Sequence, residues 1–496
     1  MFKKVLIANR GEVALRIIRA CRELGLKTVA IYSKADKESL HLRYADECCC
    51  VGEAQPEQSY LNIDKIIQTA KNFGCEAIHP GYGFLAQISS FAKACESNEI
   101  EFIGPSSDAL RNMGNKIRAR EIMASVGIPV INGSTKAVEG EDAVMEVAEK
   151  VGYPVLIKAV YGGGGRGMRI ANKKSDIAQA MELACLEADF AFGNSKVYVE
   201  KLLAKPRHIE FQLLADKKGN VIHLGERDCS VQRRYQKLIE ETPSPMMTDE
   251  LRKTMANAAI GAAKAVNYTN AGTVEFLVDK EEHFYFLEMN TRLQVEHLIT
   301  EMVTGVDIVK EQIKIAAGEE LAHKQDDVVV RGHAINCRIN CEDPYNDFVP
   351  CPSTVTKYHA PGGHGIRVDS AIYTGYTIPV FYDSLIAKLA AWGINRNEAI
   401  QRMKNALDEY EIEGTETTIP FHKKIINDKY FRRGEADTTF VQERIGSLLA
   451  PETYESEKTA ALSAALVAYL TQNKKGLAII PRRTTKRTSA WKIGRR

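Results

Sequence analysis

Polar side chains alternate along the segment E-M-N-T-R-L-Q-V-E and could together do chemistry on an anion. They are Glu288, Asn290, Arg292, Gln294 and Glu296. The aromatic run H-F-Y-F-L precedes them and is typical of a β-strand. If the strand continues through the segment, its period of two turns all these side chains onto one face. Because buried charge must be paired or bound to a metal, the segment predicts a magnesium-phosphate site with a bound anion beside it.

A second carboxylate, that of Glu275 in T-V-E-F-L-V, can face Glu288 from a neighbouring strand. The two stretches are joined through D-K-E-E-H, and a hairpin with a four-residue loop places the two glutamates opposite each other. Like charges there would destabilise the sheet unless a divalent cation lies between them. Two magnesium ions about 3.5–4 Å apart fit this arrangement. The alternative is that nearby arginines, such as Arg292, neutralise both carboxylates.

Glycines are concentrated in Y-G-G-G-G-R-G-M-R-I, residues 161–170. Strand-like stretches lie on both sides, so we expect the glycines to join two strands and not to open a helix. Backbone amides of such a flap can approach phosphate oxygens closely because no Cβ intervenes. Lys158, in the preceding strand, and Lys116 are candidate cations for the phosphates. The alternative is a flexible surface hairpin.

Two other charged segments have two possible interpretations. His208, Glu210 and Gln212 share one face of a predicted strand, which is typical of an ordinary half-buried strand but could line a nucleotide cleft. Residues 226–237, E-R-D-C-S-V-Q-R-R-Y-Q-K, form a run of charged residues that usually indicates a solvated loop. That run has a functional meaning only if it lies near the phosphates.

The composition is that of a globular protein, with 45% hydrophobic residues, 26% charged residues and a net charge of +2. This near balance gives no indication of a nucleic acid or membrane partner. No stretch approaches the length of a membrane span, and the N-terminus lacks the apolar core of a signal peptide. The 11 cysteines are odd in number and include no C-x-x-C pair. We therefore expect free thiols, no zinc and a cytoplasmic location.

The order of predicted elements divides the chain into four parts. Strands and helices alternate over residues 1–114, which predicts a Rossmann-like domain with a parallel sheet. Hairpin-like pairs over 115–320 predict an antiparallel sheet, with a small subdomain at about 131–203. Residues 330–446 mix strands and helices. Residues 450–496 contain an alanine-rich helix and a basic tail, for which partner docking is favoured over binding to a membrane or nucleic acid.

These segments together resemble biotin carboxylase, the ATP-grasp component of biotin-dependent carboxylases, over about residues 1–446. The motifs that carry the resemblance are I-A-N-R-G-E-V-A, H-P-G-Y-G-F-L, G-G-G-G-R-G-M-R, P-R-H-I-E-F-Q, E-R-D-C-S-V-Q-R-R, E-M-N-T-R-L-Q-V-E-H, R-I-N-C-E-D and Y-D-S-L-I-A-K. The resemblance implies a fold of α/β and α+β type: a Rossmann-like N-terminal domain, an ATP-grasp domain with a mobile glycine-rich lid, and a mixed C-terminal domain. In that family ATP and bicarbonate give carboxyphosphate, whose carboxyl group passes to N1 of biotin on a carrier domain.

The resemblance also implies roles for individual residues. ATP would contact Lys116, Lys158, Gly164, Gly165, Glu200, Lys201, Leu203, His208, Gln232 and Tyr235. Two magnesium or manganese ions would bind to Glu275, Glu288 and Asn290. Bicarbonate would lie against Lys237, Arg292, Gln294 and Val295, with Glu296 as the general base. Biotin would lie beside Tyr82 and Gly83, with Arg338 stabilising its enolate.

Several positions depart from the family pattern. Ala86, Gln87 and Ile88 replace the last three residues of G-Y-G-F-L-S-E-N, which removes an acid from the biotin side of the site. Tyr235 stands where a histidine is usual, Leu298 replaces a proline, and Asn336 replaces a glutamate. None of these changes removes a metal ligand, the base or the two arginines, so we expect an active enzyme.

The 496 residues contain no A-M-K-M-type biotinylation site. We therefore expect a separate polypeptide with the biotin carrier and carboxyltransferase, and a homodimer or larger complex. The extension past residue 450 resembles the catalytic A chain of two-subunit pyruvate carboxylase, which catalyses the first half-reaction towards oxaloacetate. The alternatives are the corresponding component of an acetyl-CoA or other acyl-CoA carboxylase, an ATP-grasp ligase that does not use biotin, and a nucleotide-binding subunit without activity.

Overall fold

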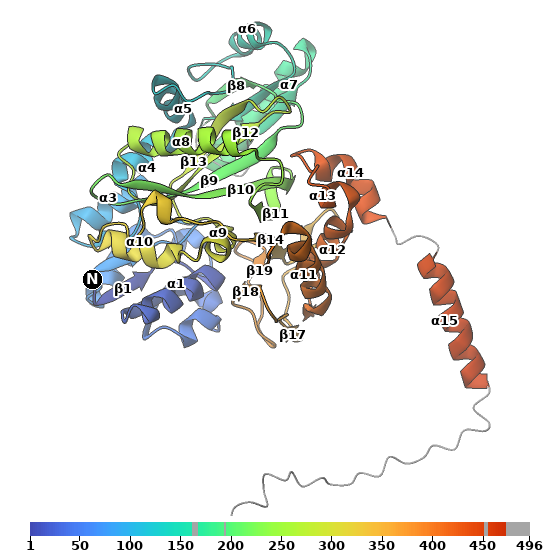
Figure 1. Cartoon of the computed structure of the whole chain (residues 1–496). Helices are drawn as coiled ribbons and strands as arrows, with labels where there is room; N and C mark the ends of the chain where they lie inside the picture. Colours follow the sequence, from blue (N-terminus) through green and yellow to red (C-terminus); the bar gives the residue numbers. More distant parts are fainter. Residues whose placement is uncertain (161–166, 193–194, 451–454, 473–496) are drawn as a thin grey trace, which may run out of the picture. The chain divides into compact units, whose positions relative to one another are not determined.

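The chain begins with a five-stranded parallel sheet whose strands alternate with helices, as the sequence predicts (Figure 1). The computed structural model describes residues 1–160, 167–192, 195–450 and 455–472. The strand order is β3-β2-β1-β4-β5. The elements are β1 (Lys4–Ile7), α1 (Gly11–Glu23), β2 (Lys27–Ser33), β3 (Glu47–Gly52), α2 (Ile63–Asn72), β4 (Ala77–His79), α3 (Ser89–Ser97), β5 (Glu101–Phe102) and α4 (Ser107–Gly114).

Strand β4 is shorter than the sequence predicts. It ends at His79, and P-G-Y-G-F forms a loop. Gly81 and Gly83 have φ angles of +63° and +71°, in the left-handed region that does not continue a strand. The loop therefore leaves the carboxyl edge of the parallel sheet, where ligands of such sheets commonly bind.

A small antiparallel sheet of three strands, in the order β7-β6-β8, follows in sequence. Strands β6 and β7 pair directly, so the glycine-rich stretch between them joins two strands as predicted. Gly164 and Gly165 themselves lie outside the described residues. The elements of this part are α5 (Lys116–Ser125), α6 (Glu141–Val151), β6 (Val155–Ala159), β7 (Met168–Ala171), α7 (Ile177–Phe192) and β8 (Val197–Lys201).

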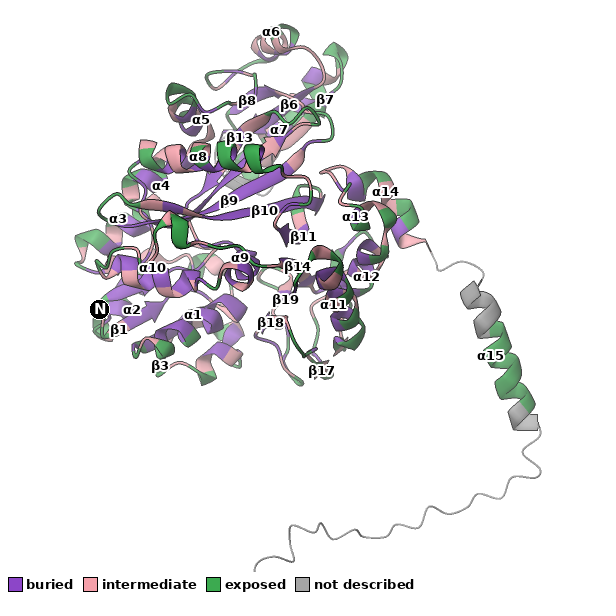
Figure 2. Cartoon of the chain, viewed as in Figure 1, coloured by how far each residue is buried: buried purple, intermediate pink, exposed green. Residues whose placement is uncertain are grey.

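The largest sheet has eight strands in the order β13-β12-β9-β10-β11-β14-β19-β18, all paired antiparallel. Figure 2 shows that its central strands β9 and β10 are mostly buried. The β11–β14 pair continues the sheet across residue 330, where the sequence predicts a change of unit. Its elements are β9 (Arg207–Ala215), β10 (Val221–Arg233), β11 (Gln236–Thr242), α8 (Asp249–Ala265), β12 (Asn270–Val278), β13 (Phe284–Asn290), α9 (His297–Thr304), α10 (Ile308–Ala316), β14 (His333–Asn340), β18 (Ile366–Ser370) and β19 (Leu385–Gly393).

Helices and two short strand pairs complete the third part of the chain. The helices are α11 (Arg396–Glu409), α12 (Ile419–Asn427), α13 (Lys429–Arg432) and α14 (Phe440–Leu449). The strand pairs are β15 (Glu342–Asp343) with β16 (Val349–Pro350), and β17 (Lys357–His359) with β20 (Glu411–Glu413).

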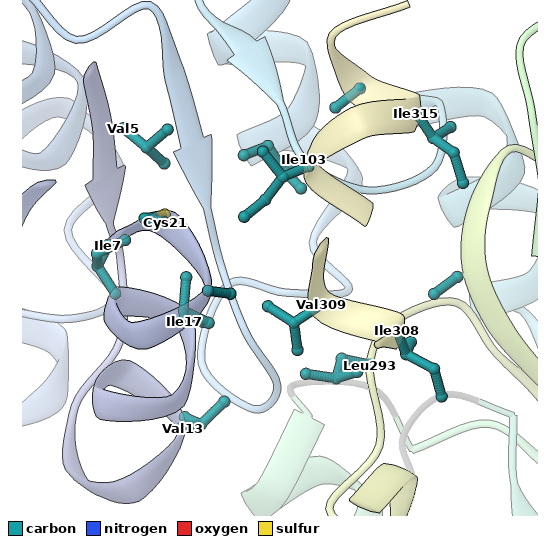
Figure 3. Packing of buried hydrophobic residues seen from close by; sticks show 14 of the residues in the cluster. Val5, Ile7, Val13, Ile17, Cys21, Ile103, Leu293, Ile308, Val309 and Ile315 are labelled. Carbon is teal, nitrogen blue, oxygen red and sulfur yellow. The ribbon is translucent and has the colours of Figure 1, made fainter. Parts of the chain in front are cut away.

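A buried hydrophobic cluster joins the first sheet to helix α10 and to the loop before α9 (Figure 3). Val5 and Ile17 contribute from the first sheet and α1, and Ile308 from α10. Leu293 is fully buried in the same cluster. Burial of a leucine stabilises by roughly 1.5–3 kcal/mol, so this contact anchors the loop that carries the candidate anion-binding residues.

Residues 449–496 form a second unit, separate from residues 1–448. Its described helix is α15 (Glu455–Gln472), on which Leu462, Leu466, Val467 and Tyr469 are exposed. Within the described ranges, no helix has the length and apolar character needed to cross a membrane.

Candidate active site

The hairpin of β12 and β13 places Glu275 opposite Glu288, which confirms the predicted pairing. The connection, residues 279–283, is one residue longer than expected, because Val278 pairs with Phe284. A bulge restores the register: Leu287 has no partner between the pairs Glu275–Glu288 and Phe276–Phe286. The two carboxylates therefore meet on one face by a combination of loop and bulge that the sequence alone did not indicate.

The prediction that the strand continues to Glu296 is wrong. Strand β13 ends at Asn290, and helix α9 begins at His297. The side chains still converge, because the loop folds back over the sheet. Gln294 Nε2 donates to Glu275 Oε1 over 2.9 Å, and Arg292 Nη2 donates to Asn290 Oδ1 over 3.1 Å.

Lys237, on β11, lies at the centre of the site. Its Nζ donates to Glu210 Oε2 over 2.5 Å, to Glu275 Oε1 over 2.7 Å and to Glu296 Oε1 over 2.8 Å. Burial opposes the charged form, but these carboxylates outweigh it and raise the pKa of Lys237 well above its ordinary value. Lys237 therefore stays a cation at any physiological pH.

Glu296 lies between two cations. Its second oxygen accepts a hydrogen bond from Arg338 Nη2 over 2.9 Å. Burial alone would raise the pKa of Glu296, but Lys237, Arg338 and Arg227 hold it far below its ordinary value. Arg338 Nε also donates to Glu240 over 2.5 Å. The carboxylate of Glu296 is therefore ionised and fixed in orientation.

Asn336, one of the positions that depart from the family pattern, joins this network from β14. It pairs with Glu240 in register and donates to Glu240 Oε2 over 2.7 Å. Burial raises the pKa of Glu240, against the charge of Arg338. The neutral amide of Asn336 therefore supports the carboxylate that orients Arg338 without adding a second buried negative charge.

Arg227 is a residue that sequence reasoning missed. It is fully buried on β10 and donates to Glu210 Oε1 over 2.5 Å, Gln294 Oε1 over 2.5 Å and Gln212 Oε1 over 2.8 Å. Residues 226–237 are thus mostly buried strand, not the solvated loop that their charge indicates. The available signal was the strand-type stretch V-I-H-L that leads directly into the run.

The predicted polar trio of β9 faces the same network. His208 Nε2 lies 2.9 Å from Glu275 Oε2, and Gln212 Nε2 donates to the Gly272 carbonyl over 3.0 Å. Glu210 is fully buried between Arg227 and Lys237. The trio therefore lines the site and is not the polar side of a half-exposed strand.

The predicted phosphate-binding lysines lie where the small sheet meets the large one. Lys158 Nζ donates to Glu200 Oε2 over 2.6 Å, and the other oxygen of Glu200 accepts from Arg120. Burial lowers the pKa of Lys116, which the charge of Glu288 partly offsets. Lys201 Nζ donates to the backbone carbonyls of residues 152 and 153. The side chains of Glu200 and Lys201 are thus engaged with protein groups.

Other predicted ligand residues surround this part of the site. Gln232 is buried and pairs with Lys237 across the β10–β11 turn, where Tyr235 has a φ of +64° and is 44% exposed. Leu203 and Val295 are partly buried. The roles predicted for these residues in nucleotide or bicarbonate binding stay predictions.

The loop after β4 brings the predicted biotin-side residues to the same region. Gln87 Oε1 accepts a hydrogen bond from Arg292 Nε over 2.8 Å, which ties this loop to the segment before α9. Tyr82 is partly buried, and Gly83 is exposed. A Cβ on Gly83 would meet no atom within 4 Å, so its α-carbon faces open space.

The oxygen donors fit a divalent cation. Glu275 Oε1 accepts hydrogen bonds from Lys237, Asn290 and Gln294. Burial would raise the pKa of Glu275, but Lys237 and His208 outweigh it and hold the pKa well below its ordinary value. Across the hairpin, no hydrogen bond or ion pair of the Glu288 carboxylate is found in the part of the chain that the structure describes. An unpaired carboxylate opposite another one, beside an amide oxygen, is a donor set for a hard cation.

Family models match almost all of residues 1–448. They are the biotin carboxylase N-terminal domain over residues 1–110, the ATP-binding domain of the carbamoyl-phosphate synthase L chain over 115–324, and the biotin carboxylase C-terminal domain over 336–443. The fold and the site therefore define an ATP-grasp ligase.

Similar proteins specify the family. The A component of pyruvate carboxylase from Methanothermobacter thermautotrophicus is 53% identical, over 95% of this chain and 99% of its own length. Biotin carboxylase 1 of Bacillus subtilis is 54% identical, over 89% and 98%. The biotin carboxylase domain dimer of Hydrogenobacter thermophilus 2-oxoglutarate carboxylase, solved with MgADP and bicarbonate, superposes with a TM-score of 0.89 at 48% identity, over 91% of this chain and 100% of its own. The chain belongs to the biotin carboxylase family.

Proposed function

We propose that this chain carboxylates biotin on a separate carrier protein, using ATP and bicarbonate through carboxyphosphate, as the first half-reaction of pyruvate carboxylase. The observation that carries the chemistry is the position of Glu296, an ionised carboxylate held between Lys237 and Arg338. A base (Glu296), an ammonium group that can bind an anion (Lys237) and a guanidinium (Arg338) lie within one hydrogen-bonded network. These are the groups that deprotonation of bicarbonate and carboxylation of biotin require.

Bicarbonate would bind where Lys237, Arg292 and Gln294 converge. Glu296 has a low pKa and is by itself a weak base, so bicarbonate must become more acidic when it binds. Neighbouring cations do this, because they stabilise the doubly charged anion that remains after proton loss. If Lys237 Nζ turns from Glu296 to the bound anion, the freed carboxylate oxygen becomes available to accept the proton.

The ATP phosphates would lie between Lys116 and Lys158 on one side and the Glu275–Glu288 pair on the other. Magnesium or manganese, when bound there, would neutralise the repulsion between the carboxylates and the phosphates. Lys158 is held by Glu200, so its ammonium group is already oriented before the nucleotide binds. Bicarbonate then attacks the γ-phosphorus, which gives carboxyphosphate and ADP.

Carboxyphosphate would break down to carbon dioxide and phosphate, and the phosphate would accept the proton from N1 of biotin. The deprotonated N1 would then attack the carbon of carbon dioxide, which forms the N–C bond of carboxybiotin. Arg338 would stabilise the negative charge that develops on the ureido oxygen of biotin. Its guanidinium is held by Glu240 and Glu296. Burial opposes the charge of Arg338, but these two carboxylates outweigh burial and keep the pKa of Arg338 above its ordinary value. A cation that does not titrate is suited to an enolate.

The longer match to a pyruvate carboxylase component supports the assignment to pyruvate carboxylase. The Bacillus subtilis biotin carboxylase covers 89% of this chain, whereas the Methanothermobacter pyruvate carboxylase component covers 95%.

The test has two stages. The purified chain should cleave ATP in a bicarbonate-dependent manner and carboxylate free biotin, and the Glu296→Gln and Arg338→Met variants should lose carboxybiotin formation. Mixed with its candidate biotin-carrying partner, the chain should fix labelled bicarbonate into oxaloacetate from pyruvate. Fixation into malonyl-CoA from acetyl-CoA would instead assign it to acetyl-CoA carboxylase, and absence of carboxybiotin would overturn the proposal.

A further inference from the structure

The loop of residues 80–84 is held from several sides, although it contains two glycines. Asn9 Nδ2 donates to the carbonyl of Pro80 over 2.6 Å and to that of Tyr82 over 2.8 Å. Gly81 permits this approach, because a Cβ there would lie 3.0 Å from Asn9 Nδ2. These bonds fix the first half of the loop against the end of β1.

The second half of the loop depends on Phe84, which has a φ of +40°. This left-handed conformation is unfavourable for a residue with a bulky side chain, so surrounding contacts must maintain it. The Phe84 ring stacks on Tyr60 with centroids 4.9 Å apart, and meets Tyr382 edge-on at 6.2 Å. The conformation next to Gly83 is therefore maintained by aromatic packing.

Both partner rings are themselves fixed through a buried carboxylate. The Tyr60 hydroxyl donates to Asp36 Oδ2 over 2.6 Å, and Arg10 donates to both oxygens of Asp36 over 2.6 and 2.7 Å. The Arg10 guanidinium lies 4.3 Å from the centroid of the Tyr382 ring. Asp36 has no exposed surface, and an ion pair in such a site keeps a fixed geometry.

Tyr382 comes from the loop between β18 and β19 and is anchored in the first sheet. Its hydroxyl donates to the Ala54 carbonyl over 2.6 Å and lies 2.6 Å from the Ser33 hydroxyl. Since the single proton of Tyr382 goes to Ala54, Ser33 is the donor of the second bond. The support of Phe84 thus comes from two distant parts of the sequence.

We propose that Tyr60 and Phe84 are positioning residues, which hold the loop 80–84 in the conformation that presents Tyr82 and Gly83 to the ring of biotin. This inference rests on the proposed function, which places biotin at that loop. Neither residue needs to touch biotin. Their effect passes through the backbone of the loop, so it should appear in biotin binding and be absent from ATP and bicarbonate chemistry.

The test is a kinetic comparison of the full chain with its Phe84→Ala and Tyr60→Phe variants, with free biotin as the varied substrate. Loss of an aromatic stack should raise the biotin KM of Phe84→Ala by about three- to tenfold. Tyr60→Phe keeps the ring and loses the bond to Asp36 and the weaker one that the hydroxyl accepts from the Ser33 amide, so we expect about a threefold increase. The KM for ATP and the rate of bicarbonate-dependent ATP cleavage without biotin should stay as in the parent chain.

Tyr410→Phe is the matched control, because it removes another buried hydroxyl, which lies 3.3 Å from that of Tyr358. It should leave every constant unchanged. An unchanged KM for biotin in both variants would overturn the inference. An equal increase of the KM for ATP and the KM for biotin would also overturn it. If Phe84→Ala does not fold, Tyr60→Phe decides alone. Failure of the parent chain to make carboxybiotin would instead contradict the proposed function.

Discussion

Gln87, in the loop after β4, forms a hydrogen bond with Arg292, in the loop before α9. The neutral amide oxygen of Gln87 accepts from the charged guanidinium at Nε over 2.8 Å. The amide nitrogen of Gln87 also donates to the Thr291 hydroxyl over 3.4 Å. No carboxylate lies within ion-pair distance of Arg292 among residues 1–160, 167–192, 195–450 and 455–472. Gln87 therefore orients the guanidinium without cancelling its charge, which leaves that charge available for an anion.

The Gln87→Glu variant should bind bicarbonate less tightly. The new carboxylate would pair with Arg292, and exposed pairs of this kind change binding energies by up to about 1 kcal/mol. We expect the KM for bicarbonate to rise by about two- to fivefold, most clearly at low ionic strength. Steady-state kinetics at two salt concentrations would measure this, and an unchanged KM at low salt would show that the charge of Arg292 does not bind bicarbonate.

Replacement of Lys237 by methionine should destabilise the fold strongly at neutral pH. Three buried carboxylates lose their shared cation, and removal of one partner from a buried ion pair costs about 3–5 kcal/mol. The loss should be smaller at pH 5 than at pH 7, because the unpaired carboxylates acquire higher pKa values and become protonated. Urea unfolding at both pH values measures it. Lys218→Met, on the surface, is the control and should change little.

Glu288→Gln should separate stability from activity. The substitution removes a like charge from opposite Glu275, so the thermal unfolding temperature should stay the same or rise. Activity should require about 10- to 100-fold more magnesium, since one oxygen ligand becomes a weaker neutral one. Glu282→Gln, in the connection between the same strands, should alter neither property. A magnesium requirement equal to that of the parent chain would contradict the metal assignment.

His422 should make the fold sensitive to mild acid. Burial lowers the pKa of His422 to about 4 from 6.5, and its Nε2 lies 2.6 Å from the carbonyl of Arg338. The unfolded chain binds the proton below about pH 6.5 and the folded chain only below about pH 4, so stability falls as the pH drops through this interval. The shift corresponds to about 3 kcal/mol.

Urea midpoints between pH 7 and 4 measure this dependence. The His422→Gln variant should have a lower midpoint at pH 7 but a flatter decline towards pH 4, because it cannot take up the proton. The exposed His359 provides the control, and His359→Gln should keep the slope of the parent chain. Equal slopes for all three proteins would contradict the assignment to His422.

The parts that sequence patterns predicted correctly are those set by short-range periodicity. Alternating strands and helices indicated the first sheet, and two apolar strands with a short connection indicated the hairpin that pairs Glu275 with Glu288, although not its longer loop and bulge. The parallel pairing of the first sheet and the direct connection of β6 to β7 also agree with expectation. Each of these depends on residues close in sequence, whose hydrophobic spacing is readable.

The errors arise where tertiary contacts override local patterns. Alternating polar residues after Asn290 suggest a strand, but burial of Leu293 in a distant cluster bends the chain into a loop. Charged residues around Arg227 suggest solvent, but the Glu210 carboxylate, the Gln294 amide and the Thr300 hydroxyl of α9 satisfy this guanidinium inside the sheet. No window of sequence contains those partners, so a buried charge in a network cannot be distinguished from a solvated one.

The eight-stranded sheet has a mechanical consequence. Glu275, Lys237 and Arg338 stand on strands of one hydrogen-bonded sheet, so the distances among them resist change. The strands that flank the glycine-rich stretch belong to the smaller, three-stranded sheet. Any opening that admits the nucleotide can therefore take place where the two sheets meet, while the reacting groups on the larger sheet keep their spacing.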